Sequence, residues 1–308
     1  MTGPPVPRST AAAAQAPAEL GIFARTFRRD SPDAVAAAVA DAGFGLVQLN
    51  LNAFGLPTIP TADDVERIDY AGIRASFARR QVRLWGVSAT YNCVHPHRDR
   101  RSRETAEAAA FIRHAGQLGA DVVTLCSGTR DPDDIWRRHP GNDDGSAWHD
   151  LRETLEELLP AAAAADVQVG IEPEPGNVVR DARRARHLLD ALGPDADRIG
   201  IVLDPANLVT PATAGEQERI LGEAFDLLGG SVVCLHAKDV PAGGDGEPGH
   251  AAAGTGLLDY DLVLRLHAAL PDAVPVVIQD AAEEDVPRVR RLLLDGSGRI
   301  RAFNDISA

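Results

Sequence analysis

Short apolar runs recur along the chain at the spacing of a repeated strand–helix unit. The runs are rich in Val, Ile and Leu and alternate little between polar and apolar residues, which is typical of strands buried on both faces of a parallel sheet. Eight such runs predict strands at Leu20–Ala24, Leu46–Leu51, Val82–Thr90, Asp121–Cys126, Val167–Ile171, Ile199–Leu203, Ser231–Ala237 and Pro275–Ile278.

Amphipathic stretches with helix start and stop signals follow most of these runs. Ser31 and Pro32 open the first helix as N-cap and first helical residue, and Gly43 closes it. Later helices are predicted over Glu104–Gly119, Trp148–Ala165, Asp181–Leu192, Glu216–Leu228, Tyr260–Ala269 and Val286–Leu294. Eight strand–helix units without a break in composition predict an α/β fold, a single (β/α)8 TIM barrel over residues 19–305. The alternative is a doubly wound open sheet, but the turn after the first strand lacks the Gly-rich nucleotide signature of that fold.

Composition narrows the setting of this barrel. The formal net charge of −14 argues against a nucleic-acid or anionic-membrane partner. No apolar run approaches the length of a membrane span, and residues 1–18 form a flexible N-terminal tail without the apolar core of a signal peptide. The cysteines, Cys93, Cys126 and Cys234, share no paired spacing and are expected to be buried free thiols. We therefore expect a cytoplasmic protein that acts on a small molecule.

Three of the strand-like runs end in side chains able to hold a divalent metal. These are Glu172, Asp204 and His236, and 32 positions separate each from the next. This is the length of one strand–helix–strand crossover, so the three side chains should lie at matching ends of successive parallel strands. Two carboxylates and an imidazole suit Mn²⁺, Mg²⁺, Co²⁺, Fe²⁺ or Zn²⁺.

Polar residues near these strand ends are candidates for catalysis. Glu174 follows Glu172 by two positions and is a candidate acid–base group. Lys238 follows His236 by two positions, on the same side of the strand, and is placed to stabilise an enolate oxygen. His95, after the third strand, is either a proton carrier or an ordinary loop histidine.

The remaining candidates are expected to contact the substrate. Asn207 follows Asp204 by three positions and either binds substrate or caps a helix. Gln279, at the end of the eighth strand, is a weak fourth metal ligand or a substrate contact, because an amide oxygen coordinates poorly and cannot carry protons. Two strand-to-helix loops, from Ser127 to about Ala147 and from Val240 to about Asp259, are long enough to cover a substrate, and the first contributes Arg130 and Trp136.

These motifs resemble the xylose isomerase-like sugar phosphate isomerase/epimerase superfamily over nearly the whole chain. The most specific parts are Ile171-Glu172-Pro-Glu174, Leu203-Asp204-Pro-Ala-Asn207, Leu235-His236-Ala-Lys238-Asp239 and Gly254-Thr-Gly256 with Asp259. The resemblance implies a divalent metal held by Glu, Asp, His and Glu, and chemistry next to a substrate carbonyl. It also implies that homo-oligomers are common.

Two positions depart from the family's pattern. Gln279 stands where the family has its second metal-binding glutamate, and Asn207 stands where a histidine is usual. In the epimerases of this family the two glutamates act as opposed acid and base, so Gln279 puts a symmetric two-base mechanism in doubt.

The sequence leaves three functions open. The first is a metal-dependent isomerase or epimerase acting on a sugar, keto-sugar or cyclitol. The second is a metal-dependent lyase or dehydratase that eliminates water or an aglycone. The third is a non-catalytic barrel with a degenerate metal site that binds a sugar or a partner subunit.

Overall fold

The computed structural model describes residues 18–242 and 250–301 and forms a closed barrel. Eight parallel strands pair in the order β1-β2-β3-β4-β5-β6-β7-β9, and β9 returns to pair with β1. The ninth strand, β8, is antiparallel to β7. The strands are β1 (Leu20–Phe23), β2 (Leu46–Leu49), β3 (Arg83–Ser88), β4 (Val122–Cys126), β5 (Gln168–Glu172), β6 (Ile199–Leu203), β7 (Val232–Asp239), β8 (Ala251–Ala252) and β9 (Val276–Ile278).

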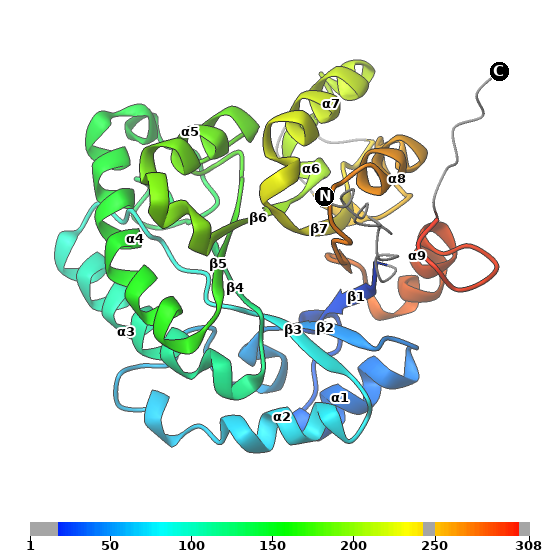
Figure 1. The fold of residues 1–308 in the computed structure, drawn as a ribbon, viewed down its shortest axis with the longest axis horizontal. Helices are drawn as coiled ribbons and strands as arrows, with labels where there is room; N and C mark the ends of the chain where they lie inside the picture. The colour runs from blue at the N-terminus through cyan, green and yellow to red at the C-terminus, as the bar shows by residue number, and fades with distance from the viewer. Residues whose placement is uncertain (1–17, 243–249, 302–308) are drawn as a thin grey trace, which may run out of the picture.

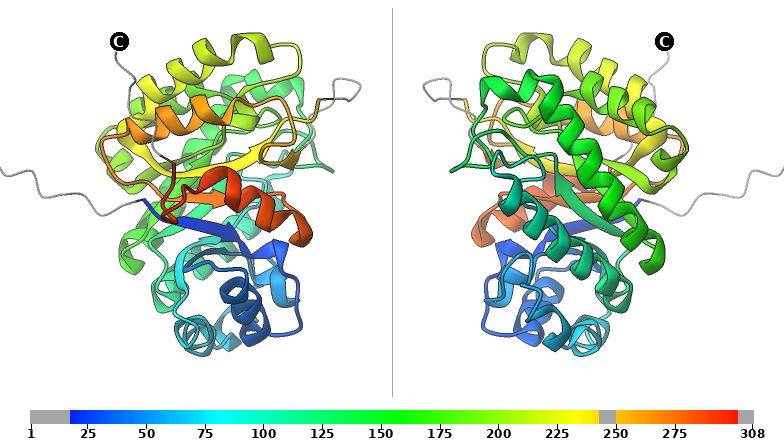
Figure 2. Two further views of the ribbon diagram at one scale, coloured as in Figure 1. Left: turned by 90° about the vertical axis from the view of Figure 1, so that its right-hand side faces the viewer. Right: turned by 90° about the vertical axis from the view of Figure 1, so that its left-hand side faces the viewer.

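Helices surround the strands on the outside, as Figures 1 and 2 show. The helices are α1 (Pro32–Asp41), α2 (Tyr70–Ala78), α3 (Arg98–Leu118), α4 (Gly145–Ala165), α5 (Ala182–Leu192), α6 (Pro205–Leu208), α7 (Gln217–Leu228), α8 (Tyr260–Ala268) and α9 (Val286–Leu293). All eight predicted barrel strands are confirmed, and the fold is the predicted (β/α)8 barrel. The predicted flexible tail lies almost entirely within residues 1–17, outside the described residues.

The predicted starts of two helices were wrong. α3 begins at Arg98 rather than Glu104, and α4 begins at Gly145 rather than Trp148. The first turn of α3 is rich in arginine, and only Arg101 among these residues is buried there, so the sequence shows no apolar stripe. Ser31 does cap α1 as predicted, since its side chain accepts a hydrogen bond from the amide of Ala34.

The core has an outer and an inner part. The outer part fills the space between strands and helices, while the inner part lies inside the barrel and consists of Phe23, Leu46, Trp85, Val122, Val202, Cys234 and Val277. Most of these residues lie two positions before a polar residue that is on the same strand or directly follows it: Gln48, Thr124, Asp204, His236 or Gln279. Because alternate residues of a strand share a face, an apolar layer closes the barrel beneath a polar layer.

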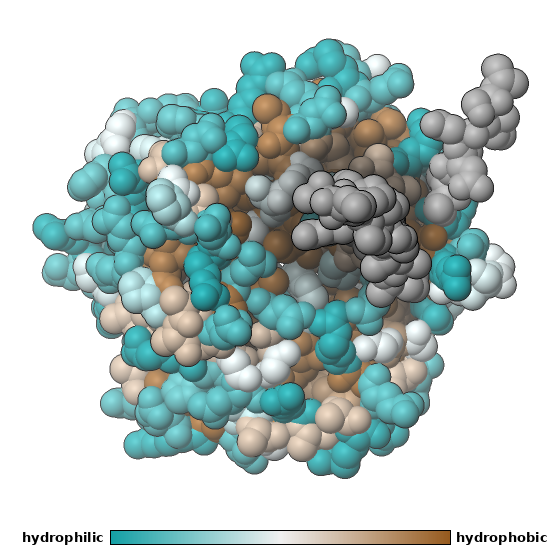
Figure 3. Space-filling model, in the orientation of Figure 1, coloured by the Kyte–Doolittle hydropathy of each residue, from teal (hydrophilic) through white to brown (hydrophobic). Residues whose placement is uncertain are grey.

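The surface is largely hydrophilic. Hydrophilic side chains cover most of the face shown in Figure 3, with hydrophobic residues gathered toward its centre. Among the described residues Trp136 is the one large hydrophobic side chain that is exposed. The described helices contain no segment long and apolar enough to cross a membrane. All three cysteines are buried free thiols, as predicted.

Candidate metal centre

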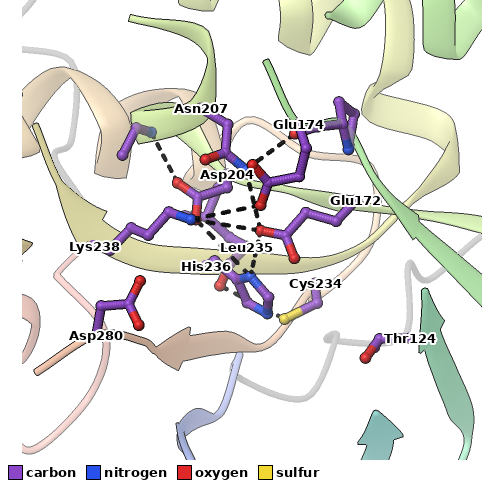
Figure 4. A network of polar contacts seen from close by, with 12 residues as sticks. Thr124, Glu172, Glu174, Asp204, Asn207, Cys234, Leu235, His236, Lys238 and Asp280 are labelled. Atoms are coloured by element: carbon purple, nitrogen blue, oxygen red, sulfur yellow. Dashed lines mark hydrogen bonds and ion pairs between the residues drawn. The ribbon is translucent and has the colours of Figure 1, made fainter. Parts of the chain in front are cut away.

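Glu172, Asp204 and His236 converge at the carboxyl ends of β5, β6 and β7 (Figure 4). One ligand atom from each lies within 4.8 Å of the others. Glu172 Oε1 is 3.1 Å from His236 Nδ1, and Asp204 Oδ2 is 3.9 Å from the same nitrogen. Bonds of about 2 Å to a shared cation would hold ligand atoms at such separations.

One extra residue in β7 brings His236 to the inside of the barrel. The register between β6 and β7 shifts at Val233, and beyond the shift Val202 pairs with Cys234. His236 is thereby level with Asp204 and on the same face. Without the extra residue Leu235 would be the neighbour of Asp204, and His236 would point outward.

Two buried oxygens beside this group lack hydrogen-bond partners. They are Oδ2 of Asp204, which has an ion pair with Lys238 at 3.2 Å but accepts no hydrogen bond, and Oε1 of Gln279. A buried acceptor without a donor is costly, and a bound cation satisfies it. The residues therefore fit a divalent cation held by Glu172, Asp204 and His236, with the amide of Gln279 as the available fourth oxygen.

A chain of buried side chains orients His236 from behind. The Nε2 atom of His236 lies 2.8 Å from Oε1 of Gln48, and Nε2 of Gln48 donates to Oγ1 of Thr124 at 3.1 Å. The bond to Thr124 fixes the amide so that its oxygen faces the imidazole. With a metal bound, His236 would carry its proton on Nε2 and offer Nδ1 as the ligand atom, whereas without a metal Nδ1 donates a hydrogen bond to Oε1 of Glu172.

We expect Gln48→Leu to weaken divalent-metal affinity by roughly 10- to 100-fold, as removal of such supporting contacts typically does. Leucine cannot accept a hydrogen bond from the Nε2–H group of His236, so the imidazole loses the contact that sets its orientation and its tautomer. Isothermal titration of Mn²⁺ into the metal-free protein measures the loss. Thr124→Val, which keeps the Gln48–His236 contact, should cost less. Equal affinities in wild type and Gln48→Leu would show that the contact does not support the site.

Lys238 places its ammonium among the carboxylates. Its Nζ lies 3.2 Å from Asp204 Oδ2 and 3.8 Å from Oε1 of both Glu172 and Glu174, and its side chain is 2% exposed. Burial alone would lower the pKa of Lys238, but the three carboxylates raise it above its ordinary value. The amine is therefore a permanent cation and cannot serve as a base.

The carboxylates themselves divide into two kinds. Burial would raise the pKa of Glu172, but the charge and hydrogen bond of His236 lower it to about 2. Burial and the charge of Glu172 instead raise the pKa of Glu174 to about 8. Asn207 donates to Glu172 Oε1 at 3.2 Å and to the carbonyl of Pro173 at 3.0 Å, which holds the segment bearing both glutamates. One carboxylate is thus fixed as an anion, and the other is able to exchange protons near neutrality.

These shifts predict that the metal-free protein loses stability as pH rises from about 5 to 8. Burial raises the pKa of Asp204 to about 6, and Glu174 titrates at about 8, so the folded state keeps protons that the unfolded state has released. The stabilisation is complete below pH 4 and is lost by about pH 8. Thermal melts with a chelator present measure it. Glu174→Gln should flatten the decline, and a wild-type melting temperature that rises over this range would contradict the assignment.

His95 lies in a different part of the mouth. Its Nδ1 accepts from the amide of His97 at 3.1 Å, and its Nε2 lies 3.1 Å from the carbonyl of Pro132. It lines a cavity of about 340 Å³ together with Tyr91 and Asp131. Both ring nitrogens are occupied by backbone groups, so His95 has the contacts of a structural residue.

Two further predicted contacts are also engaged elsewhere. Arg130 pairs with Asp150 at 2.7 Å and donates to the carbonyl of Val94 at 2.9 Å. Trp136 is 51% exposed, and its carbonyl packs so closely on Gly176 that there is no room for a Cβ at that position. The loop carrying Trp136 therefore supports the turn after Glu174, while the indole itself faces solvent.

Sequence reasoning missed Gln48, Thr124 and Asp280. Gln48 and Thr124 are polar residues inside otherwise apolar strands, which was the available signal. Asp280 directly follows Gln279 and appears beside Lys238 in Figure 4. Its backbone has a φ of 52°, a left-handed conformation that no pattern in the sequence predicts.

Several solved structures share the fold. The 3-keto-D-glucoside 4-epimerase YcjR of E. coli is 13% identical, with a TM-score of 0.65 over 89% of this chain and 99% of that one. The IOLI protein with a bound zinc atom is 13% identical, with a TM-score of 0.64 over 89% of this chain and 96% of that one. The probable 3-DHS dehydratase AsbF of Bacillus anthracis is 12% identical, with a TM-score of 0.63 over 89% and 98%. At these identities the likeness shows the fold alone.

The sequence comparison is more specific. No curated protein matches the chain. The family described as xylose isomerase-like TIM barrel matches residues 36–277, which is most of the chain and includes the ends of β5, β6 and β7. The protein belongs to the xylose isomerase-like TIM barrel family.

Proposed function

We propose that the protein is a divalent-metal-dependent isomerase or epimerase acting on a sugar, keto-sugar or cyclitol. The observation that carries the proposal is the convergence of Glu172, Asp204 and His236 beside Glu174 and Lys238. A cation held by the first three would polarise a substrate carbonyl and acidify the neighbouring C–H bond. Among the structures that share the fold, YcjR is a 3-keto-D-glucoside 4-epimerase and the IOLI protein binds zinc, and both descriptions agree with this proposal.

Each residue has a distinct role in this proposal. Glu174 removes the proton next to the carbonyl, because its carboxylate is 10% exposed and its pKa lies near neutrality. Lys238 holds the enediolate oxygen that develops, since its ammonium is fixed and nearly free of water. Asn207 keeps the segment from Glu172 to Glu174 in place.

Solvent exchange tests the proposal directly. The metal-loaded protein is incubated in D₂O with the D-ketohexoses psicose, fructose, sorbose and tagatose and with 2-keto-inositol, and deuterium at carbon is followed by NMR. We expect exchange with at least one of them, lost on chelation and in Glu174→Gln. Absence of exchange across the whole set would contradict the proposal.

A lyase is the second candidate, favoured by Gln279. With an amide in place of a carboxylate, a single base and an acid on the leaving group suffice for elimination. Mass spectrometry of the product separates the two reactions. The product of an isomerase or epimerase has the mass of the substrate apart from incorporated deuterium. The product of a lyase is lighter by the mass of water or of an aglycone.

A further inference from the structure

The segment after β7 folds back over the end of that strand. β8 is antiparallel to β7, with Ala252 opposite Lys238 and Ala251 opposite Asp239. His250 immediately precedes β8. Because alternate residues of a strand share a face, His250 lies on the face of Ala252 and therefore of Lys238. The pairing thus places the imidazole of His250 on the face of this strand pair that is turned toward the candidate metal centre.

This fold-back is held by a buried carboxylate. Asp239 is fully buried, and its oxygens accept hydrogen bonds from the amides of Val240, Gly254, Gly256 and Leu258 at 2.8–3.0 Å. The hydroxyl of Tyr260 also donates to the carbonyl of Lys238 at 2.7 Å. Because Asp239 and Tyr260 hold this segment by hydrogen bonds, the β7–β8 pair is a rigid support for the side chains that it carries.

Asp280 approaches the same place from the neighbouring strand. It follows β9 with a φ of 52°, a left-handed conformation that residues other than glycine seldom adopt. Its Oδ2 lies 3.8 Å from Nδ1 of His250, and both side chains are about two-fifths exposed, at 39% and 42%. The unusual backbone turns a carboxylate toward the imidazole and leaves Nε2 of His250 as the nitrogen available to a substrate.

The pair lies on the other side of the site from Glu174. In Figure 4, Glu174 and Asp280 flank the group formed by Asp204, His236 and Lys238. They reach it from the loop after β5 and from the end of β9, with β6 and β7 between them. Burial and the charge of Lys238 lower the pKa of His250, while the carboxylates of Asp280 and Glu172 act in the opposite direction and favour its protonated form. The imidazole is therefore within electrostatic reach of the site.

We propose that His250 is the second acid–base group of the reaction, opposite Glu174, and that Asp280 is the positioning residue that orients its ring. The inference rests on the proposed function, and it specifies epimerisation. It restores the opposed acid and base that Gln279 removes from the end of β9, but with a residue carried by the segment after β7.

The step is a proton exchange at one carbon. Glu174 takes the proton next to the carbonyl, so the C–H bond breaks, an O–H bond forms, and the electron pair moves to the carbonyl oxygen beside Lys238. The protonated imidazole of His250 then gives its Nε2 proton to the opposite face of that carbon, which restores the carbonyl and inverts the centre. Glu174 is left with a proton, which it releases to solvent through its 10% exposed carboxylate, and His250 is left without one. His250 regains its proton from solvent, to which it is 42% exposed.

The test compares exchange with inversion in D₂O, using the metal-loaded protein and the D-ketohexoses psicose, fructose, sorbose and tagatose. Wild type should exchange the carbon-bound proton and also form the epimer. His250→Asn should still exchange, through Glu174, but form epimer on the order of 10²- to 10⁴-fold more slowly. Asp280→Asn should lower kcat for epimer formation and leave KM unchanged, and Asp280→Glu should recover part of the loss.

Controls separate this inference from the proposed function. His187→Asn, at an exposed histidine of α5 stacked on Trp148, should match wild type. Metal content and melting temperature of His250→Asn should also match wild type, which excludes a folding defect. The role of His250 would be overturned if His250→Asn formed the epimer at the wild-type rate. It would also be overturned if wild type exchanged the proton without inverting the carbon, and either result would leave the proposed function standing. Failure of wild type to exchange any of these ketoses or 2-keto-inositol would overturn both proposals.

Discussion

Asp204→Asn is expected to leave the purified protein with almost no divalent metal, whereas wild type carries close to one ion per chain. The variant keeps the acceptor at Oδ1, which receives the amide of Ala206 at 2.8 Å and caps α6. Oδ2 is fully buried, accepts no hydrogen bond and has an ion pair with Lys238. In the variant an amide NH₂ group, which cannot bind a cation, takes its place. We expect a loss larger than the roughly 10- to 100-fold typical of supporting residues. Metal mass spectrometry on protein purified without a metal-affinity tag measures it.

Glu174→Gln is the matched control for this experiment. Glu174 lies two residues from Glu172 and 3.8 Å from Lys238, yet it is not one of the three clustered ligands. It should keep its metal while losing exchange activity. If neither wild type nor Asp204→Asn holds metal after reconstitution, the family's metal site has been lost in this chain, and the non-catalytic alternative gains support.

Asp150→Ala is expected to lower the free energy of unfolding by about 3 to 5 kcal/mol, because it leaves two buried guanidinium groups without their counter-ion. Asp150 of α4 lies 3.0 Å from Arg101 of α3 and 2.7 Å from Arg130 of the loop after β4. The three side chains are 17%, 8% and 12% exposed, so water compensates little. Urea denaturation with a fixed slope measures the change.

Asp143 provides an exposed counterpart in the same chain. It pairs with Arg138, Arg180 and Arg184, but its side chain is 46% exposed. Exposed pairs typically contribute up to about 1 kcal/mol, so Asp143→Ala should be close to wild type. Equal losses in the two variants would show that burial of the Asp150 cluster does not set its contribution.

The strands and the convergence of the three candidate ligands could be predicted from the sequence for simple physical reasons. A strand buried on both faces must be apolar throughout, and the spacing of Glu172, Asp204 and His236 is set by crossover length. The starts of two helices were predicted less well than the strands. The first turn of α3 is rich in arginine and has no apolar periodicity that would mark it as helical. Boundaries of this kind depend on tertiary contacts more than on local pattern.

The supporting residues could not be predicted, because their contacts are long-range or depend on backbone geometry. Gln48 meets His236 across 188 positions of sequence. The inward direction of His236 depends on the extra residue in β7, which is visible only in the strand pairing. Arg130 was predicted to contact substrate, but the structure gives its guanidinium to Asp150, a partner on α4 that no motif links to it.

The closure of the barrel has a consequence for how the chain is made. Leu20 of β1 pairs with Val276 of β9. One edge of β1 therefore stays unpaired during synthesis until β9, near the end of the chain, has left the ribosome. All three ligand residues are translated before β9, yet the wall beside them is missing until residues 276–278 emerge. Pairing between distant segments slows folding and prolongs the exposure of unpaired strand edges. Nascent chains stalled before residue 276 should therefore be more sensitive to protease and more dependent on chaperones than the 308-residue chain carrying a C-terminal linker long enough for β9 to clear the exit tunnel.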